Sequence, residues 1–258
     1  MAGITGMNGS TNSSDLYGKI ASGRRINSAA DDASGLTIAE KLKEQSNGLT
    51  AGASNAKAGM GVLNIADGAL GSVNDSLQRI YELSVKASNS AVYSAGDIGA
   101  MQEEISGLLK DIQGVAKGTE YNQMKLLDGS MADMQLATNP DGTGQSIKMQ
   151  NATLEALGID GYDVTGKFDI NRITKAIDMV SKSRSEIGAS TNALESAYNY
   201  NTYTNQNTIA AQSGIEDLDI AQAVSDQKKN SLLDDYQNMM QKQQMDNAEQ
   251  SVLGLFRF

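Results

Sequence analysis

An apolar repeat with a spacing of seven residues is the feature that most constrains the fold of this chain. Sustained heptads place apolar side chains on one stripe of an α-helix and are typical of coiled-coil packing. We therefore predict one long helix from Leu36 to about Ala91. At ~1.5 Å per residue it is on the order of 80 Å long, which predicts an elongated rod. The repeat consists of Leu42, Leu49, Ala56, Leu63, Leu70 and Leu77, with a second seam at Ala66, Val73 and Ile80.

The composition fits a thin helical bundle. The 258 residues include one Pro and no Cys, His or Trp, and 5% are aromatic. Scarce Pro permits long helices, because Pro removes a helical hydrogen bond and clashes with the preceding turn. A formal charge of −10 argues against nucleic-acid binding and against anionic membrane surfaces. No apolar run reaches the ~20 residues needed to span a bilayer, so we expect no membrane insertion.

Two further helices follow from the same periodicity. The segment Met101–Lys117 has Ile105, Leu109, Ile112 and Ala116 on one face, after a turn at Ser94–Asp97. A third helix begins at Ile170. Its seven-residue stripe comprises Ile173, Val180, Ile187 and Leu194.

A β-hairpin is predicted between the second and third helices. The turn signal is Asn139-Pro140-Asp141-Gly142, flanked by strands at Asp133–Ala137 and Ser146–Asn151. We interpret Gly118–Gly129 as a loop. The glycines of the first long helix are expected to let a partner backbone approach and to favour intersubunit packing; they are Gly48, Gly52, Gly59, Gly61, Gly68 and Gly71.

The chain ends are expected to pair. The segment 27–32 reads as a helix entry that Ser28 or Asp31 caps. The segment Ser231–Phe258 is amphipathic and rich in Met and Gln. An apolar helix at a chain end is not expected to stay exposed, so it should bury itself in other subunits. The predicted fold is mainly α: a coiled-coil rod of bundled helices with a small β-hairpin and both termini paired at one end.

Several short blocks, in order along nearly the whole chain, resemble bacterial flagellin. They are ASGRRINSAADDASGL at 21–36, LQRIYELSVKA at 77–87, TEYN at 119–122, LLDG at 126–129, IEDLD at 215–219 and VLGL at 252–255. The middle of the chain has room only for the hairpin, so it looks like a minimal flagellin without variable outer domains. The resemblance implies a terminal coiled-coil domain, residues 1–35 with 219–258, and a rod domain, residues 36–218.

The resemblance also implies a function. It predicts a structural subunit that self-assembles into the extracellular flagellar filament used for motility, exported through the flagellar type III route without a cleaved signal peptide. Implied partners are copies of itself, an export chaperone, the filament cap and hook-junction proteins. The alternative is a hook–filament junction protein or a minor flagellin, because the run before the 21–36 block is about ten residues, or ~15 Å of helix, shorter than is usual in the family.

Carried over from the family, Arg79, Leu83 and Glu104 are candidate contacts for the innate immune receptor Toll-like receptor 5. We expect Arg79 and Leu83 to be exposed one turn apart, where they can anchor a partner surface. The alternative is that these side chains face the next subunit or solvent. Tyr81 stands where many relatives have Arg.

No enzymatic or metal site is predicted. The absence of His excludes a His-ligated zinc site, and no nucleotide-binding or hydrolase motif occurs. The carboxylates Asp31 and Asp32 are expected to cap helices and form ion pairs rather than to bind Ca²⁺ or act as acid and base, and no cofactor is expected. Arg25 is expected to pair with an acidic residue of a neighbouring subunit. The candidate assembly residues are Arg25, Ile26, Asp31, Asp32, Leu232, Leu233, Met240, Val252, Leu253 and Leu255.

Overall fold

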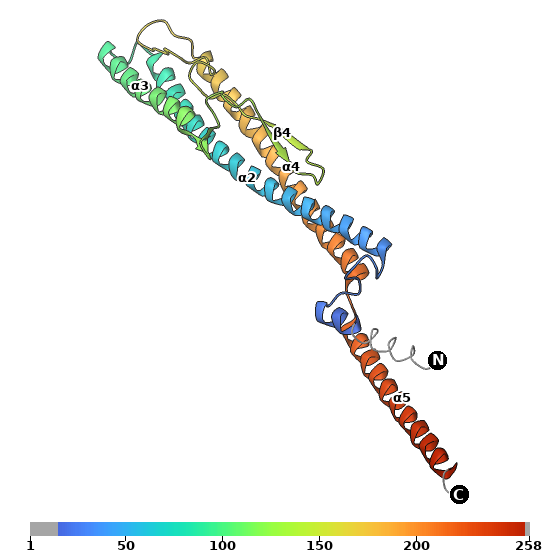
Figure 1. Ribbon diagram of the computed structural model, residues 1–258. Helices are drawn as coiled ribbons and strands as arrows, with labels where there is room; N and C mark the ends of the chain where they lie inside the picture. The colour runs from blue at the N-terminus through green and yellow to red at the C-terminus, as the bar shows by residue number, and fades with distance from the viewer. Residues whose placement is uncertain (1–14, 256–258) are drawn as a thin grey trace. The chain divides into compact units, whose positions relative to one another are not determined.

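The computed structural model describes the backbone of residues 15–255 and the side chains of residues 15–247. The mainly α prediction is confirmed. Residues 15–22 are helical. The named elements that follow are α2 (Ala33–Ala87), α3 (Ala95–Gly118), β1 (Glu120–Tyr121), β2 (Met124–Lys125), β3 (Asp133–Ala137), β4 (Gly144–Lys148), α4 (Asn171–Glu216) and α5 (Ile220–Leu255), drawn in Figure 1.

Two compact units make up the chain. One comprises the chain up to Glu44 together with the chain from Asn207 onward, and the other comprises Gln45–Gln206. The boundaries fall within α2 and α4. The expected division at residues 35 and 219 stays a prediction. The expected pairing of the termini involves residues 1–14 and 256–258, which lie outside the described part of the chain.

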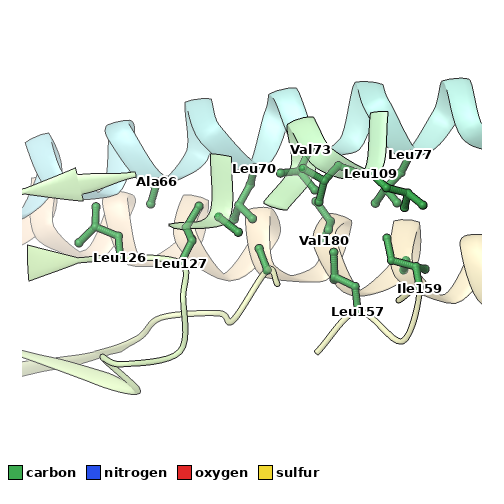
Figure 2. Packing of buried hydrophobic residues seen from close by; sticks show 14 of the residues in the cluster. Ala66, Leu70, Val73, Leu77, Leu109, Leu126, Leu127, Leu157, Ile159 and Val180 are labelled. Carbon is green, nitrogen blue, oxygen red and sulfur yellow. The ribbon is translucent and has the colours of Figure 1, made fainter. Parts of the chain in front are cut away.

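The heptad stripe of α2 is buried along most of its length, as predicted. Leu63, Leu70 and Leu77 are fully buried, whereas Leu42 is only half-buried. The stripe of α4 from Ile173 to Leu194 packs against it, and Figure 1 shows α2 and α4 side by side in the 45–206 unit. Figure 2 shows apolar side chains meeting between these helices. Burial of each such side chain favours folding by about 1.5–3 kcal/mol, so the two stripes supply the main cohesion of this unit.

Helix α3 presents the predicted face but begins earlier than predicted. Ile105, Leu109, Ile112 and Ala116 are all buried. Ser94 and Asp97, which we interpreted as a turn, instead form a capping box. The Ser94 side chain accepts from the Asp97 amide, and the Asp97 carboxylate accepts from the Ser94 amide at 2.9 Å. This exchange satisfies two free amides and lets the helix begin at Ala95.

The hairpin forms at the predicted turn with a different second strand. β3 pairs antiparallel with β4 in a register that sets Asp133 opposite Lys148 and Ala137 opposite Gly144. The second strand therefore starts two residues earlier than predicted and ends three earlier. The amides of Thr138 and Asn139 both donate to the Thr143 carbonyl, which closes the turn directly before Gly144. The predicted loop 118–129 contains a second short hairpin, β1–β2.

The tip of the β3–β4 hairpin lies against three of the glycines in α2 (Figure 1). A Cβ on Gly52 would collide with the Thr138 carbonyl oxygen, and a Cβ on Gly48 would lie 2.8 Å from the Pro140 side chain. A Cβ on Gly59 would lie 2.7 Å from Leu136. The prediction that these glycines admit a neighbouring subunit is therefore wrong for Gly48, Gly52 and Gly59. The atoms that approach them, backbone at Gly52 and side chains at Gly59, belong to the same chain.

The irregular connection from β4 to α4 contributes several buried side chains to the core. Tyr162 is 2% exposed, and its hydroxyl donates to the Ser84 hydroxyl at 3.0 Å. The Gln102 side chain donates to the Tyr162 carbonyl and accepts from the Val164 amide. Arg172 lies 5.8 Å from the centre of the Tyr162 ring, in cation–π range. Side chains from α2, α3 and α4 thus replace the strand partners that this segment lacks.

Candidate functional site

Helix α5 carries a set of exposed apolar side chains on one face. Among its described side chains only Ala223 is buried. The exposed apolar residues recur at spacings of three and four, which places them on one side of an α-helix. We call them the α5 face: Leu232, Leu233, Tyr236, Met239 and Met240, which are 69%, 48%, 61%, 69% and 40% exposed.

Met245 is also exposed but does not belong to this face. It follows Tyr236 by about two and a half helical turns, so it points to the opposite side of α5. Its exposed fraction, 72%, is close to that of Met239. Leu232, Leu233 and Met240 were predicted as assembly residues, and all three are exposed in the monomer. The side chains of Val252, Leu253 and Leu255, also predicted, lie outside the described side chains.

The segment before α2 is joined by backbone hydrogen bonds to the break between α4 and α5. The Arg25 amide donates to the Glu216 carbonyl at 2.7 Å, and the Leu218 amide donates to the Gly23 carbonyl at 2.9 Å. Gly23 has φ +69°, a left-handed conformation that favours glycine. This two-strand contact forms a junction, defined here as residues 22–32 with 215–219.

Arginine side chains reinforce the junction. Arg24 pairs with Glu216 at 2.8 Å, and Arg25 donates to the Ile215 carbonyl at 2.6 Å and lies 3.8 Å from Asp32. The Arg25 side chain stays 50% exposed beside these contacts, and its pairing with an acid of a neighbouring subunit stays a prediction. Ile26 is 2% exposed and packs within the junction.

Asp31 and Asp32 have different roles, and only Asp32 caps a helix, which corrects the prediction. Asp32 caps α2, because its carboxylate accepts from the Gly35 amide at 2.8 Å. Asp31 closes the preceding turn by accepting from the Asn27 and Ser28 amides, so neither Ser28 nor Asp31 is the cap.

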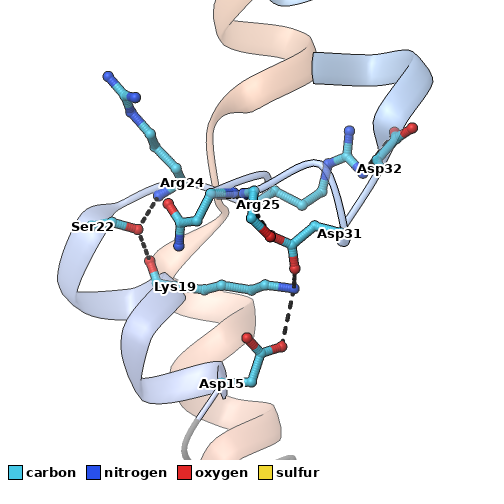
Figure 3. Close-up of polar contacts among 9 residues, drawn as sticks. Asp15, Lys19, Ser22, Arg24, Arg25, Asp31 and Asp32 are labelled. Atoms are coloured by element: carbon cyan, nitrogen blue, oxygen red, sulfur yellow. Dashed lines mark hydrogen bonds and ion pairs between the residues drawn. The ribbon is translucent and has the colours of Figure 1, made fainter. Parts of the chain in front are cut away.

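An ion pair fixes the position of Asp31. Its carboxylate lies 2.7 Å from the Lys19 ammonium, and Lys19 also reaches Asp15 at 3.2 Å (Figure 3). The Lys19 hydrogen bond, followed by those from the Asn27 and Ser28 amides, holds the pKa of Asp31 well below its usual range. Hydrogen bonds to the Asp31 carboxylate and then to Asp15 raise the pKa of Lys19. Within the described residues, no group of three or more acidic, His or Cys side chains is placed to hold a metal ion.

The candidate receptor residues form an ion pair over the α2–α3 pair. Arg79 donates to Glu104 at 2.7 Å and to Glu82 at 3.1 Å, and these contacts raise its pKa. The side chains of Arg79 and Glu104 are 43% and 45% exposed, so both are accessible. Leu83 is 3% exposed and belongs to the core cluster, so its expected exposure is wrong. Its exposed apolar neighbours are Tyr81 and Val85.

Family models match both ends of the chain. The model described as bacterial flagellin N-terminal helical region matches residues 5–132, and that described as bacterial flagellin C-terminal helical region matches residues 170–256. Together these ranges cover most of the sequence.

The chain belongs to the bacterial flagellin family.

Curated flagellins share about a third of its residues over nearly their whole length. The flagellin of Bacillus subtilis (strain 168) is 34% identical over 278 residues, which cover 93% of this chain and 91% of that protein. The flagellar filament 33 kDa core protein of Treponema phagedenis is 32% identical over 93% of this chain and 90% of that protein. As a flagellin, the chain is a structural subunit of the bacterial flagellar filament.

Solved structures share its fold. A putative flagellar hook-associated protein from Vibrio parahaemolyticus aligns with a TM-score of 0.61 at 14% identity, over 72% of this chain and all of that one. Bacillus cereus flagellin aligns with a TM-score of 0.50 at 22% identity, over 57% of this chain and 88% of that one. At these identities the likeness shows the fold alone.

Sequence reasoning missed two ion pairs of this flagellin. Arg24 pairs with Glu216 inside the junction, and Lys19, which precedes the junction, pairs with Asp31. The opposite charges of Arg24-Arg25 and Glu216-Asp217, one pair in each of two motif blocks, were an available signal for this contact. No described helix of this flagellin combines the length and apolarity needed to cross a bilayer.

Proposed function

We propose that this flagellin polymerises by burying the α5 face against copies of itself. The observation that carries the proposal is the exposure of Leu232, Tyr236 and Met239 at 61–69% on a helix with one buried described side chain. Each such side chain, once buried, favours association by about 1.5–3 kcal/mol. In a monomer the α5 face stays in water and contributes no burial free energy. In a filament in which every copy covers its neighbour's face, all of these side chains contribute.

In this proposal the junction acts on assembly indirectly. The predicted assembly residues Arg25, Ile26, Asp31 and Asp32 all make contacts within their own chain. They hold the segment 22–32 against the break between α4 and α5. Their contribution is to fix the local path of the chain where α5 begins, which keeps α5 available for a neighbouring copy.

We propose that Arg79 and Glu104 form part of a surface for Toll-like receptor 5. Their mutual ion pair leaves both side chains partly exposed, and an accessible Arg is a frequent anchor in protein interfaces. Tyr81 and Val85 are exposed apolar residues of the same helix, at 40% and 47%. Leu83 supports this surface from within the core and does not contact the partner.

Family membership supports the remaining partners. We propose that an export chaperone covers the α5 face before export by the flagellar type III route, without cleavage of a signal peptide, and that the filament cap and hook-junction proteins contact the subunit during assembly. Methionine side chains suit a face that must fit several partners, because they are unbranched and adaptable. We further propose a purely structural role without enzymatic activity.

Polymerisation of purified variants tests the proposal. Leu233→Asp places a charge on the α5 face, and Met245→Asp places the same charge on the opposite side of the helix. With seeds of filament fragments and a precipitating salt, we expect Leu233→Asp to lower the polymerised fraction at least about tenfold, because a buried unpaired carboxylate is costly. Met245→Asp should stay near wild type.

Sedimentation and negative-stain electron microscopy give the readout. Equal polymerisation of both variants and the wild type would overturn the proposal. Equal loss in both variants would also contradict it, because the effect would then not depend on the face. Circular dichroism of the monomers checks that the rod helices are unchanged.

A further inference from the structure

The sulfur chemistry of this chain resides in its methionines. The sequence has 12 Met and no Cys, so thioethers are its only readily oxidised sulfur groups. Several are exposed in the monomer. Met239 and Met245 are 69% and 72% exposed, and Met240 is 40% exposed. Met124 and Met179, in the 45–206 unit, are 41% and 36% exposed.

Met239 and Met245, the two most exposed methionines among the described side chains, lie on different sides of α5. Met239 and Met240 lie on the α5 face among Leu232, Leu233 and Tyr236. Met245 lies on the opposite side of the same helix. Similar exposure predicts similar reactivity toward a small oxidant, so position on the helix is the main difference between Met239 and Met245. The pair therefore separates oxidation as such from oxidation of the α5 face.

We propose that Met239 and Met240 form an oxidation site that controls whether a subunit can polymerise. This inference rests on the proposed function of the α5 face. The modifying reagent is a peroxide of the hydrogen peroxide class. The thioether sulfur attacks one peroxide oxygen and the O–O bond breaks. The sulfur is oxidised by two electrons and keeps the attacked oxygen as a sulfoxide. The proton of that oxygen passes to the other peroxide oxygen, which leaves as water.

The product is unsuited to an apolar interface. A sulfoxide is polar and accepts hydrogen bonds strongly, so its burial against apolar side chains leaves it unpaired. An oxidised monomer is therefore excluded from the growing filament. In a subunit that is already assembled, the α5 face is covered and its methionines are protected. Methionine sulfoxide reductases reverse the modification, so the exclusion is reversible.

The experiment treats purified full-length monomer with hydrogen peroxide, locates sulfoxides by peptide mass spectrometry and measures seeded polymerisation by sedimentation. The proteins are wild type, the double variant Met239→Leu with Met240→Leu, and the matched control Met245→Leu. Met-to-Leu exchange preserves volume and removes the oxidisable sulfur, so untreated variants should polymerise within about twofold of wild type.

After peroxide, we expect wild type and Met245→Leu to polymerise at least about fivefold less, because both keep the sulfoxides on the α5 face. The double variant should keep its untreated level, although its other methionines are oxidised. Treatment of oxidised wild type with methionine sulfoxide reductases should restore polymerisation. Peroxide applied to finished filaments should modify Met239 and Met240 much less than it does in monomer.

Three results would overturn the inference. The first is normal polymerisation of oxidised wild type, and the second is resistance of Met239 and Met240 to peroxide in the monomer. The third is a loss of polymerisation in the peroxide-treated double variant as large as that in wild type. Failure of the proposed function is distinguishable from these. In that case unoxidised Leu233→Asp polymerises normally, a result that involves no oxidation.

Discussion

The side-chain amide nitrogen of Asn201 lies 2.7 Å from the carbonyl oxygen of Thr138 and donates a hydrogen bond to it across 63 residues of sequence. Both residues are buried, at 1% and 2% exposure. From α2, the Asn55 amide donates in the same way to the Ala137 carbonyl at 2.8 Å. Side chains from two helices of the 45–206 unit therefore hold the tip of the β3–β4 hairpin against α2 and α4.

Removal of this contact should destabilise the unit. Asn201→Ala leaves the buried Thr138 carbonyl without its donor, which costs about 1–3 kcal/mol in the free energy of unfolding. Urea denaturation of the monomer measures the change. Asn199→Ala, an exposed position on the same helix, should change the free energy by less than about 0.5 kcal/mol. Equal effects of the two substitutions would contradict a specific role for Asn201.

Two glycines of α2 should respond to alanine with opposite signs. In Gly52→Ala the new methyl group meets the Thr138 carbonyl and Asn201, so the hairpin tip must move and stability should fall by about 1–3 kcal/mol. Gly61 has nothing within 4 Å of an added Cβ, so Gly61→Ala should gain up to about 1 kcal/mol from helix propensity. Urea denaturation of both variants gives the comparison. Stabilisation by Gly52→Ala would show that the hairpin does not press on α2.

The junction should lose stability in acid. The pKa of Asp31 is lower in the folded chain than its unfolded value of about 3.9. The charged carboxylate therefore stabilises the fold above that value, and the contribution is lost as pH falls from about 4 toward the folded pKa. Asp31→Asn should lower the melting temperature at pH 7. The difference in melting temperature between this variant and wild type should become smaller toward pH 2.

Differential scanning calorimetry between pH 7 and pH 2 makes this measurement. Asp111→Asn, at an exposed position of α3, is the control and should have little effect at either end of the range. If the difference in melting temperature between Asp31→Asn and wild type stayed constant with pH, Asp31 would not account for the loss of stability in acid.

The receptor proposal predicts a pattern of affinities. Arg79→Ala should weaken binding of the monomer to the Toll-like receptor 5 ectodomain at least about fivefold, because a truncated Arg anchor typically costs more than about 1 kcal/mol. Arg184→Ala is the control, since Arg184 also forms an ion pair, to Asp67 at 2.8 Å, with a similar exposed fraction of 40%. Surface plasmon resonance measures both. Similar affinities for the two variants would move the receptor surface away from Arg79.

The long-period features of the fold were predictable from the sequence. Leu63, Leu70 and Leu77, and likewise Ile173 and Val180, are buried where the heptads placed them. This succeeds because helical burial depends on local spacing. The start of α3 was missed although Ser94 and Asp97 have the spacing of a capping box, since the same two residues also fit a turn.

Long-range contacts explain what the sequence did not reveal. The β4–α4 connection has no periodic signal, and its burial depends on Gln102, which is 60 residues from the Tyr162 carbonyl it binds. For Leu83, the family resemblance predicted a receptor contact but did not indicate which face of α2 carries the side chain. Its spacing of three from the buried Ile80 was the signal that it faces the core.

A single introduced cysteine tests the central claim most directly, because the chain has none of its own. Leu233→Cys reports on the α5 face, and Asn238→Cys reports on the other side of the helix. Maleimide labelling should modify both in the monomer. In polymerised filaments we predict strong protection at position 233 and continued labelling at position 238. Equal labelling of position 233 in monomer and filament would contradict assembly through the α5 face.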